Sequence, residues 1–187
     1  TDDPHVTGIG TDGTYLYLIQ SQHPEEIVKV TKTGTLVSKF EVFVDQPQSI
    51  EYYNGSFWVS EEEDFTSRQL SMSGALLKSF PAPGLSTNDL DWENGYLWAL
   101  DSGTDMLYQM DANGNIYSGK PVNTFGKGLA FQDASHFWVS DGSGSGRLAR
   151  FLLVEDTTSP LISTLPSIVD VTGSSAIISW GTNEPTD

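Results

Sequence analysis

An internal repeat of about forty residues constrains the fold of this chain more than any other feature of its sequence. One marker is an aromatic residue at the centre of a short apolar segment, and its four copies are 41, 40 and 40 positions apart: Tyr17, Trp58, Trp98 and Trp138. Two further markers keep nearly the same period: Ile9, Ile50, Leu90 and Leu129, and Gly34, Gly74 and Gly114. Several markers sharing one period indicate a repeat architecture in which each copy packs against its neighbours.

The turn residues within each copy predict two hairpins per repeat. Two short apolar segments are separated by Asp12-Gly13, Asn54-Gly55 or Asn94-Gly95 in the first three copies. Such pairs favour the type I′ turn of a tight antiparallel hairpin. A second hairpin turn follows at each of the three glycine markers, so every repeat has four strands. In the third repeat we expect them over residues 88–93, 96–101, 106–111 and 115–120.

The second strand of each repeat is apolar at nearly consecutive positions, which indicates burial on both of its faces. Small four-stranded sheets stacked around an axis form a β-propeller, whose blades have about 40–45 residues. The predicted fold is therefore all-β, with antiparallel blades over residues 5–44, 45–84, 85–123 and 124–157. The fourth repeat ends after its third strand, near Glu155. Three arrangements stay open: a four-bladed ring, an arc of a larger ring, or an arc completed by another subunit.

The repeat segments at 49–61, 89–101 and 107–115 resemble those of NHL-like propellers and of the gluconolactonase and strictosidine-synthase group. The resemblance covers about residues 5–156 and implies the architecture; such propellers include enzymes, binding modules and scaffolds. In gluconolactonase-like enzymes a divalent ion lies over the central channel and polarises the substrate carbonyl. The ligand pattern of that family is loosely echoed here by Glu51, Asn88 and Asp141.

The tail of the chain, residues 159–187, differs from the repeats. Its composition changes from Pro160, and residues 168–180 alternate apolar and polar side chains. This tail is similar to the first two strands of a fibronectin type III domain. A complete sandwich of that kind needs about 100 residues, so we expect an incomplete domain.

Charge and composition exclude several classes of function. The chain carries 25 acidic and 9 basic side chains, a net charge of −16. Such a charge repels phosphate groups, so we expect neither nucleic-acid binding nor docking on anionic membranes. The chain has no cysteine, which excludes disulfides, zinc–thiolate sites and cysteine nucleophiles. No apolar run is long enough to insert into a membrane. With the modular tail, these properties lead us to expect an extracellular or cell-surface protein.

Candidate site residues lie in the loops that a four-stranded meander places on one face of the propeller. Carboxylate and amide oxygens suit calcium, and the candidate ligands are Glu61, Asn88, Asp89, Asp101 and Asp141. A structural role competes with this, because an acidic residue that closes a strand often accepts backbone N–H groups of its own loop. The candidate partner-binding residues of the same rim are Glu62, Glu63, Asp64 and Asp105.

Three functional hypotheses follow from these patterns. The first is a non-catalytic propeller that recognises a protein or glycan through the acidic rim, in adhesion or assembly. The second is a metal-dependent enzyme, similar to the lactonases, hydrolases or lyases of this architecture. The third is a structural subunit whose unfinished blade edges associate between copies. No arrangement of histidine, cysteine or serine points to a catalytic residue, and no cofactor other than calcium is indicated.

Overall fold

The computed structural model describes residues 5–144, 146–153, 162–171 and 175–182. This part of the chain consists of strands, turns and loops, and no helix within it could cross a membrane. The chain divides into two compact units, Thr1–Leu153 and Val154–Asp187. The domain boundary predicted at 158/159 lies outside the described residues.

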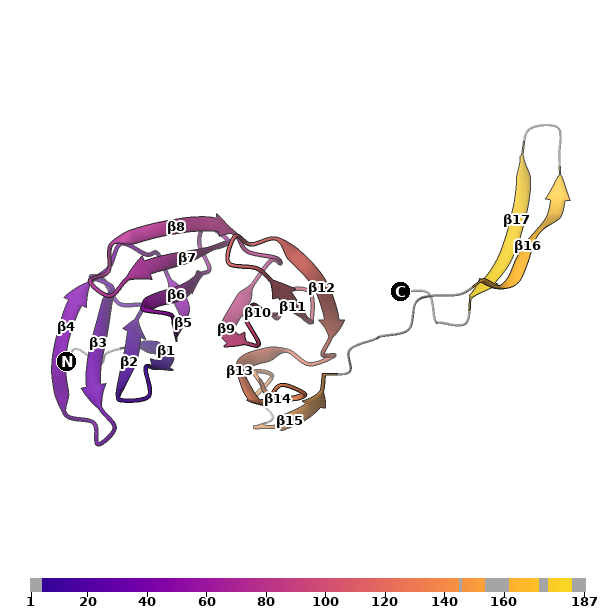
Figure 1. Cartoon of the computed structure of the whole chain (residues 1–187). Helices are drawn as coiled ribbons and strands as arrows, with labels where there is room; N and C mark the ends of the chain where they lie inside the picture. Colours follow the sequence, from indigo (N-terminus) through magenta and orange to yellow (C-terminus); the bar gives the residue numbers. More distant parts are fainter. Residues whose placement is uncertain (1–4, 145, 154–161, 172–174, 183–187) are drawn as a thin grey trace. The chain divides into compact units, whose positions relative to one another are not determined.

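The first unit is a β-propeller of four blades, as the repeat predicts (Figure 1). Each blade is an antiparallel meander in which sequential strands are neighbours. The first two blades are β1 (Val6–Thr11), β2 (Tyr15–Gln20), β3 (Glu26–Thr31), β4 (Leu36–Glu41), then β5 (Pro47–Tyr53), β6 (Ser56–Glu61), β7 (Thr66–Ser71) and β8 (Leu76–Pro81). The third is β9 (Thr87–Glu93), β10 (Tyr96–Asp101), β11 (Met106–Met110) and β12 (Ile116–Pro121), and the fourth is β13 (Gly126–Asp133), β14 (His136–Asp141) and β15 (Leu148–Leu152).

The strands of the third repeat agree with their predicted ranges to within a residue, because the turn chemistry fixes where each strand ends. Asn94 and Gly95 both have positive φ angles, 53° and 80°, as a type I′ turn requires. The fourth blade has three strands in the described residues, in keeping with the early end of its repeat.

Neighbouring blades are held together by the aromatic residue at the centre of each second strand. Tyr17 of β2 packs against Phe57 of the second blade, with ring centroids 4.8 Å apart. Trp58 contacts Leu90 and other buried residues of the third blade, and Trp98 packs into the core of the fourth. These three aromatic side chains are almost fully buried. These three aromatic residues therefore join each of the first three blades to the next one.

The innermost strands β1, β5, β9 and β13 follow one another along the inner side of the unit (Figure 1). Between β1 and β5 the backbones approach closely. A Cβ atom at Gly8 would lie 2.7 Å from the backbone nitrogen of Ile50, so this position admits only glycine without a shift of the strands. The inner strands thus bring their side chains together around one central space.

We expect Gly114→Ala to destabilise the protein by about 1–3 kcal/mol more than Gly34→Ala. Both glycines occupy the same hairpin position with φ near 80°, so the backbone strain of an alanine is shared. A Cβ at Gly114 would lie 2.4 Å from the Phe80 ring, whereas Gly34 has no atom within 4 Å. Urea unfolding of the two variants measures the difference; equal losses would show that the Phe80 contact has no energetic consequence.

The second unit contains a hairpin of β16 (Ile162–Val171) and β17 (Ala176–Thr182), which pair antiparallel. Two strands are what the sequence predicts for this tail, and their identity as the start of a fibronectin type III domain stays a prediction. The side chains of these strands lie outside the described residues.

Candidate functional site

One face of the propeller is formed by two sets of loops, which we call the loop face. The first set joins successive blades and comprises residues 42–46, 82–86 and 122–125. The second set joins the second and third strands of a blade and comprises residues 21–25, 62–65, 102–105, 142–144 and 146–147. Backbone hydrogen bonds connect the two sets: Ala82 donates to the carbonyl of Phe65, and Gly142 donates to that of Phe125.

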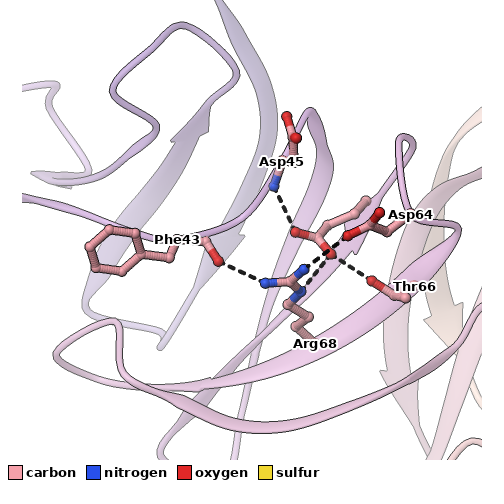
Figure 2. A network of polar contacts seen from close by, with 6 residues as sticks. Phe43, Asp45, Asp64, Thr66 and Arg68 are labelled. Atoms are coloured by element: carbon pink, nitrogen blue, oxygen red, sulfur yellow. Dashed lines mark hydrogen bonds and ion pairs between the residues drawn. The ribbon is translucent and has the colours of Figure 1, made fainter.

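Glu61, at the end of β6, is buried. Its polar network includes the residues that are labelled in Figure 2: Phe43, Asp45, Asp64, Thr66 and Arg68. Its carboxylate accepts the backbone N–H of Asp45 at 2.7 Å and the hydroxyl of Thr66, and it pairs with the guanidinium of Arg68. Arg68 also donates to the carbonyl oxygen of Phe43 at 2.8 Å. The Glu61 carboxylate and Arg68 therefore hold the loop 42–46 against the second blade.

Asp101, at the end of β10, occupies the equivalent position in the third blade. It accepts the backbone N–H groups of Ser86 and Thr104 at 2.7 and 2.8 Å. Asp141, in the fourth blade, accepts the backbone N–H of Ser143 at 2.8 Å. All three carboxylates bond the backbone of nearby loops, as the structural alternative predicts. In the described residues, no three acidic or histidine side chains are placed to hold a metal ion; calcium binding stays a prediction.

Asn88 and Asp89, the other two predicted ligands, lie on β9 beside a central cavity. The buried Asn88 side chain donates hydrogen bonds to the carbonyl of Ser86 at 2.8 Å and to the hydroxyl of Ser102. Its amide oxygen accepts a hydrogen bond from the ammonium group of Lys127. The bond between Asn88 and Lys127 joins the beginning of β9 in the third blade to the beginning of β13 in the fourth.

Three carboxyl groups line this cavity, and sequence reasoning singled out two of them. Asp89 accepts the backbone N–H of Leu129 at 2.7 Å, and Asp91 accepts that of Phe131 at 2.9 Å. Both side chains thereby satisfy backbone donors of β13. Glu51 of β5 lies close enough to Asp91 and Asp89 for their charges to interact with its own. Asp91 and Glu51 occupy the same position in successive repeats, and this shared position was the sequence signal for Asp91.

The environment of these carboxyl groups favours their protonated forms. Burial, together with the negative charges of Asp91 and Asp89, raises the pKa of Glu51 to about 8. Burial raises the pKa of Asp89 to about 7, although the N–H groups of Leu129 and Leu90 act in the opposite direction. Burial also raises the pKa of Asp91. Carboxyl groups that titrate near neutral pH in a cavity can donate or accept protons.

The cavity itself has a volume of about 730 Å³. Its wall combines the three carboxyl groups and Lys127 with apolar side chains from β1, β2 and β13, among them Ile9, Leu16 and Leu18. A space of this size, with an apolar wall and a few convergent polar groups, is typical of sites for small organic ligands.

We expect the stability of the protein to fall between about pH 4.5 and 8, and Glu51→Gln to flatten this dependence. A carboxyl group whose folded-state pKa is raised stabilises the fold fully below its unfolded-state pKa. That contribution is lost as pH rises through the folded-state pKa, about 8 for Glu51. Urea unfolding of both proteins across this range tests the effect. Parallel curves would contradict the burial of an uncompensated carboxyl group.

The predicted partner-binding residues lie on the loop face and differ in the contacts that their carboxylates make. Glu62 accepts a hydrogen bond from Gln48 at 2.8 Å, and Glu63 accepts one from Gln46 at 3.0 Å. Asp64 lies 3.4 Å from an Nη atom of Arg68. All of these carboxylates are exposed, as is Asp105, so their negative charge faces solvent.

Sequence reasoning missed the apolar side chains on the same face. Phe43 is 88% exposed and Leu85 67% exposed, and both belong to loops that join successive blades. Phe65 and Phe125 are about half exposed on the same face. The sequence signal for each of them was a large apolar residue within a predicted connecting loop. Exposed aromatic residues among charges are typical of interaction surfaces.

No protein-family model matches the sequence, and no curated protein matches it. Solved structures resemble the fold. Glutaminyl cyclase from Myxococcus xanthus aligns with a TM-score of 0.65 and 16% identity, over 80% of this chain and 73% of that one. Virginiamycin B lyase from Staphylococcus aureus aligns with a TM-score of 0.55 and 19% identity, over 73% of this chain and 47% of that one. The WD40 β-propeller domain of Doa1 aligns with a TM-score of 0.53 and 14% identity, over 76% of this chain and 53% of that one. The chain spans about half the length of the latter two, and these identities show a shared propeller fold.

Proposed function

We propose that the protein is a non-catalytic recognition module whose loop face binds a protein partner with a basic surface and apolar anchors. The observation that carries this proposal is the exposure of Phe43, Leu85, Phe65 and Phe125 among acidic side chains on one face. When a partner removes such exposed apolar side chains from water, their burial lowers the free energy of the complex. A basic partner is favoured because the whole chain carries a net charge of −16.

The Glu61 network supports this role because it holds the loop 42–46 of the face in place at two positions before any partner arrives. Its carboxylate fixes the backbone at Asp45, and its partner Arg68 fixes the backbone at Phe43. A surface that is ordered in advance loses less conformational entropy on binding. We further propose that the module acts outside the cell or at its surface, followed by fibronectin-type modules and related to the NHL-like propellers.

Titration with the peptide Lys-Lys-Phe-Lys-Lys tests the proposal by calorimetry. We expect saturable binding that weakens at least tenfold in Phe43→Ser and in Glu62→Lys. The matched control is Glu93→Lys, an equal charge change at the turn between β9 and β10 on the opposite face. Equal weakening in the control would show that the effect depends only on the net charge of the protein. If neither this peptide nor a lysine peptide without phenylalanine binds, the proposal is overturned.

A second candidate is an enzyme that uses the central cavity, favoured by the raised pKa values of Glu51 and Asp89. These groups would supply acid–base chemistry to a small substrate. Hydrolysis of δ-gluconolactone, lost in Glu51→Gln, would support this candidate. A metal-dependent version predicts stabilisation by calcium of about 2.7 kcal/mol at a hundredfold excess over Kd. The absence of both δ-gluconolactone turnover and a calcium-induced shift in melting temperature would count against this candidate.

A further inference from the structure

The loop that joins β2 and β3, residues 21–25, differs from its counterparts in where it places one acidic side chain. The residues that directly precede β3, β7 and β11 are Glu25, Phe65 and Asp105. The backbone carbonyl of each accepts an N–H from the loop that leads to the next blade. Phe65 and Asp105 are exposed, whereas Glu25 is only 6% exposed. Among these three equivalent positions, the first blade therefore has the buried carboxylate.

The Glu25 side chain lines a pocket on the loop face, between the first and second blades. The pocket has a volume of about 400 Å³. Its apolar lining consists of the buried Val42 and Val44 together with the exposed Phe43. A buried carboxylate beside an apolar wall matches the structure of a lysine side chain, which has an apolar stem and a cationic end.

In the described part of the chain, the side chain that pairs with the Glu25 carboxylate is the imidazole of His23. Nδ1 of His23 lies 2.9 Å from Oε1 of Glu25. The Glu25 side chain is 7% exposed, and the His23 side chain is 89% exposed. An imidazole with this exposure regains hydration when it leaves, whereas a buried carboxylate that loses its partner is destabilised. The pair therefore allows exchange of the imidazole for another cation.

The charges around the imidazole also favour a cation. The Arg68 guanidinium is paired with Glu61 and Asp64, so its charge is balanced within its own network. The lining thus retains an excess of negative charge beside His23. The acidic and basic side chains that line the pocket with His23 are Glu25, Glu41, Asp45, Asp64 and Arg68.

We propose that this pocket, which we call the lysine pocket, receives a lysine side chain of the partner, whose ammonium group replaces His23 on the Glu25 carboxylate. The lysine stem packs against Phe43, and the acidic side chains of the lining attract the ammonium group. This inference rests on the proposed function, because it names the part of the loop face that recognises the basic partner.

The exchange with His23 makes lysine binding depend on pH. The hydrogen bond with Glu25 and the negative charge of that residue raise the pKa of His23, with a smaller effect of Asp45. Protonated His23 holds Glu25 as an ion pair, whereas neutral His23 leaves the carboxylate open to another cation. Binding is therefore weaker below the pKa of His23 and stronger above it. By reciprocity, a bound lysine should lower that pKa.

Calorimetric titration with the blocked peptide acetyl-Lys-Lys-Phe-Lys-Lys-amide at pH 5.5 and pH 8 tests the proposal. We expect the wild-type affinity to be about tenfold higher at pH 8, because the fraction of protein with neutral His23 sets the apparent affinity. In His23→Ala the affinities at the two pH values should be nearly equal. That variant also shows how much the other titrating groups, such as Glu51, contribute.

Glu25→Gln should weaken peptide binding about tenfold at pH 8, since it removes the charge that the ammonium group pairs with. The matched control is Asp105→Asn, which removes one negative charge at the equivalent, exposed position of the third blade and should weaken binding less than about threefold. Circular dichroism and a cooperative urea transition verify that the variants fold. Equal affinities of Glu25→Gln and wild-type protein for the peptide would overturn the lysine pocket and leave recognition by the loop face intact.

An NMR titration of the histidine ring signals separates this inference from the proposed function. The probe is N-acetyl-lysine-N-methylamide, a single lysine side chain without an apolar anchor, and the blocked peptide is measured in parallel. Either ligand should lower the pKa of His23, while the signals of His136 at the turn between β13 and β14 should not respond. If the peptide does not bind but the probe lowers the pKa of His23, the lysine pocket stands and the proposed recognition of the peptide fails. No response of His23 to either ligand overturns the lysine pocket.

Discussion

Replacing Trp58 by alanine is expected to lower the free energy of unfolding by about 3–5 kcal/mol. The Trp58 side chain is buried between the second and third blades, where its ring lies 5.0 Å from that of Trp92 and 6.2 Å from that of Phe80. An alanine leaves a cavity at this junction and removes an apolar surface that no neighbouring side chain can replace. Because each blade is stabilised by its neighbours, the loss affects the whole unit.

Chemical unfolding followed by tryptophan fluorescence and circular dichroism measures this effect. The matched control is Tyr117→Ala, which removes an aromatic side chain that is 62% exposed and should cost less than about 1 kcal/mol. Similar losses for the two variants would show that the junction between the blades does not depend on the repeated aromatic residue.

Replacing Arg68 by methionine is expected to lower the free energy of unfolding by about 3–5 kcal/mol. The guanidinium is mostly buried, and its partner Glu61 is completely buried. Without the arginine, the carboxylate keeps its bonds to Asp45 and Thr66 but lacks a compensating positive charge. The loss should also release the backbone at Phe43, because Arg68 donates to its carbonyl oxygen.

A double-mutant cycle separates the pair from its surroundings. Glu61→Gln combined with Arg68→Met should cost less than the sum of the single changes, since the double variant contains no unpaired charge. Asp64→Asn is the control: its carboxylate is 60% exposed and 3.4 Å from Arg68, so its loss should cost under about 1 kcal/mol. Additive single changes would contradict a coupled buried pair.

The architecture could be predicted from the sequence because the same packing problem recurs at a fixed interval. Tyr17, Trp58 and Trp98 are spaced by the repeat and bury themselves in the next blade, and turns such as Asn94-Gly95 fix the strand ends. The fourth copy shows the limit of this reasoning: Trp138 has the same spacing but only partial burial. The period predicts the type of contact, whereas burial also depends on a following blade.

The candidate site was less predictable, because it depends on contacts between residues far apart in the sequence. The sequence left both a metal-binding and a structural role open for Glu61 and Asp101, and only the folded loops show that these carboxylates accept backbone N–H groups. The raised pKa of Glu51 follows from burial beside Asp89 and Asp91 on another blade, which the sequence does not reveal. The charge of the rim was evident from sequence, while the exposure of Phe43 depends on how its loop is held.

Mapping of the peptide Lys-Lys-Phe-Lys-Lys onto the protein by NMR tests the proposed function most directly. Amide shifts of the ¹⁵N-labelled chain are followed during the titration. The account predicts changes concentrated at Phe43, Phe65, Leu85 and Phe125 and in the acidic loops beside them, saturating together with one Kd. Changes confined to the turns on the opposite face, such as Asn94-Gly95, or no saturable change in any described loop, would contradict recognition by the loop face.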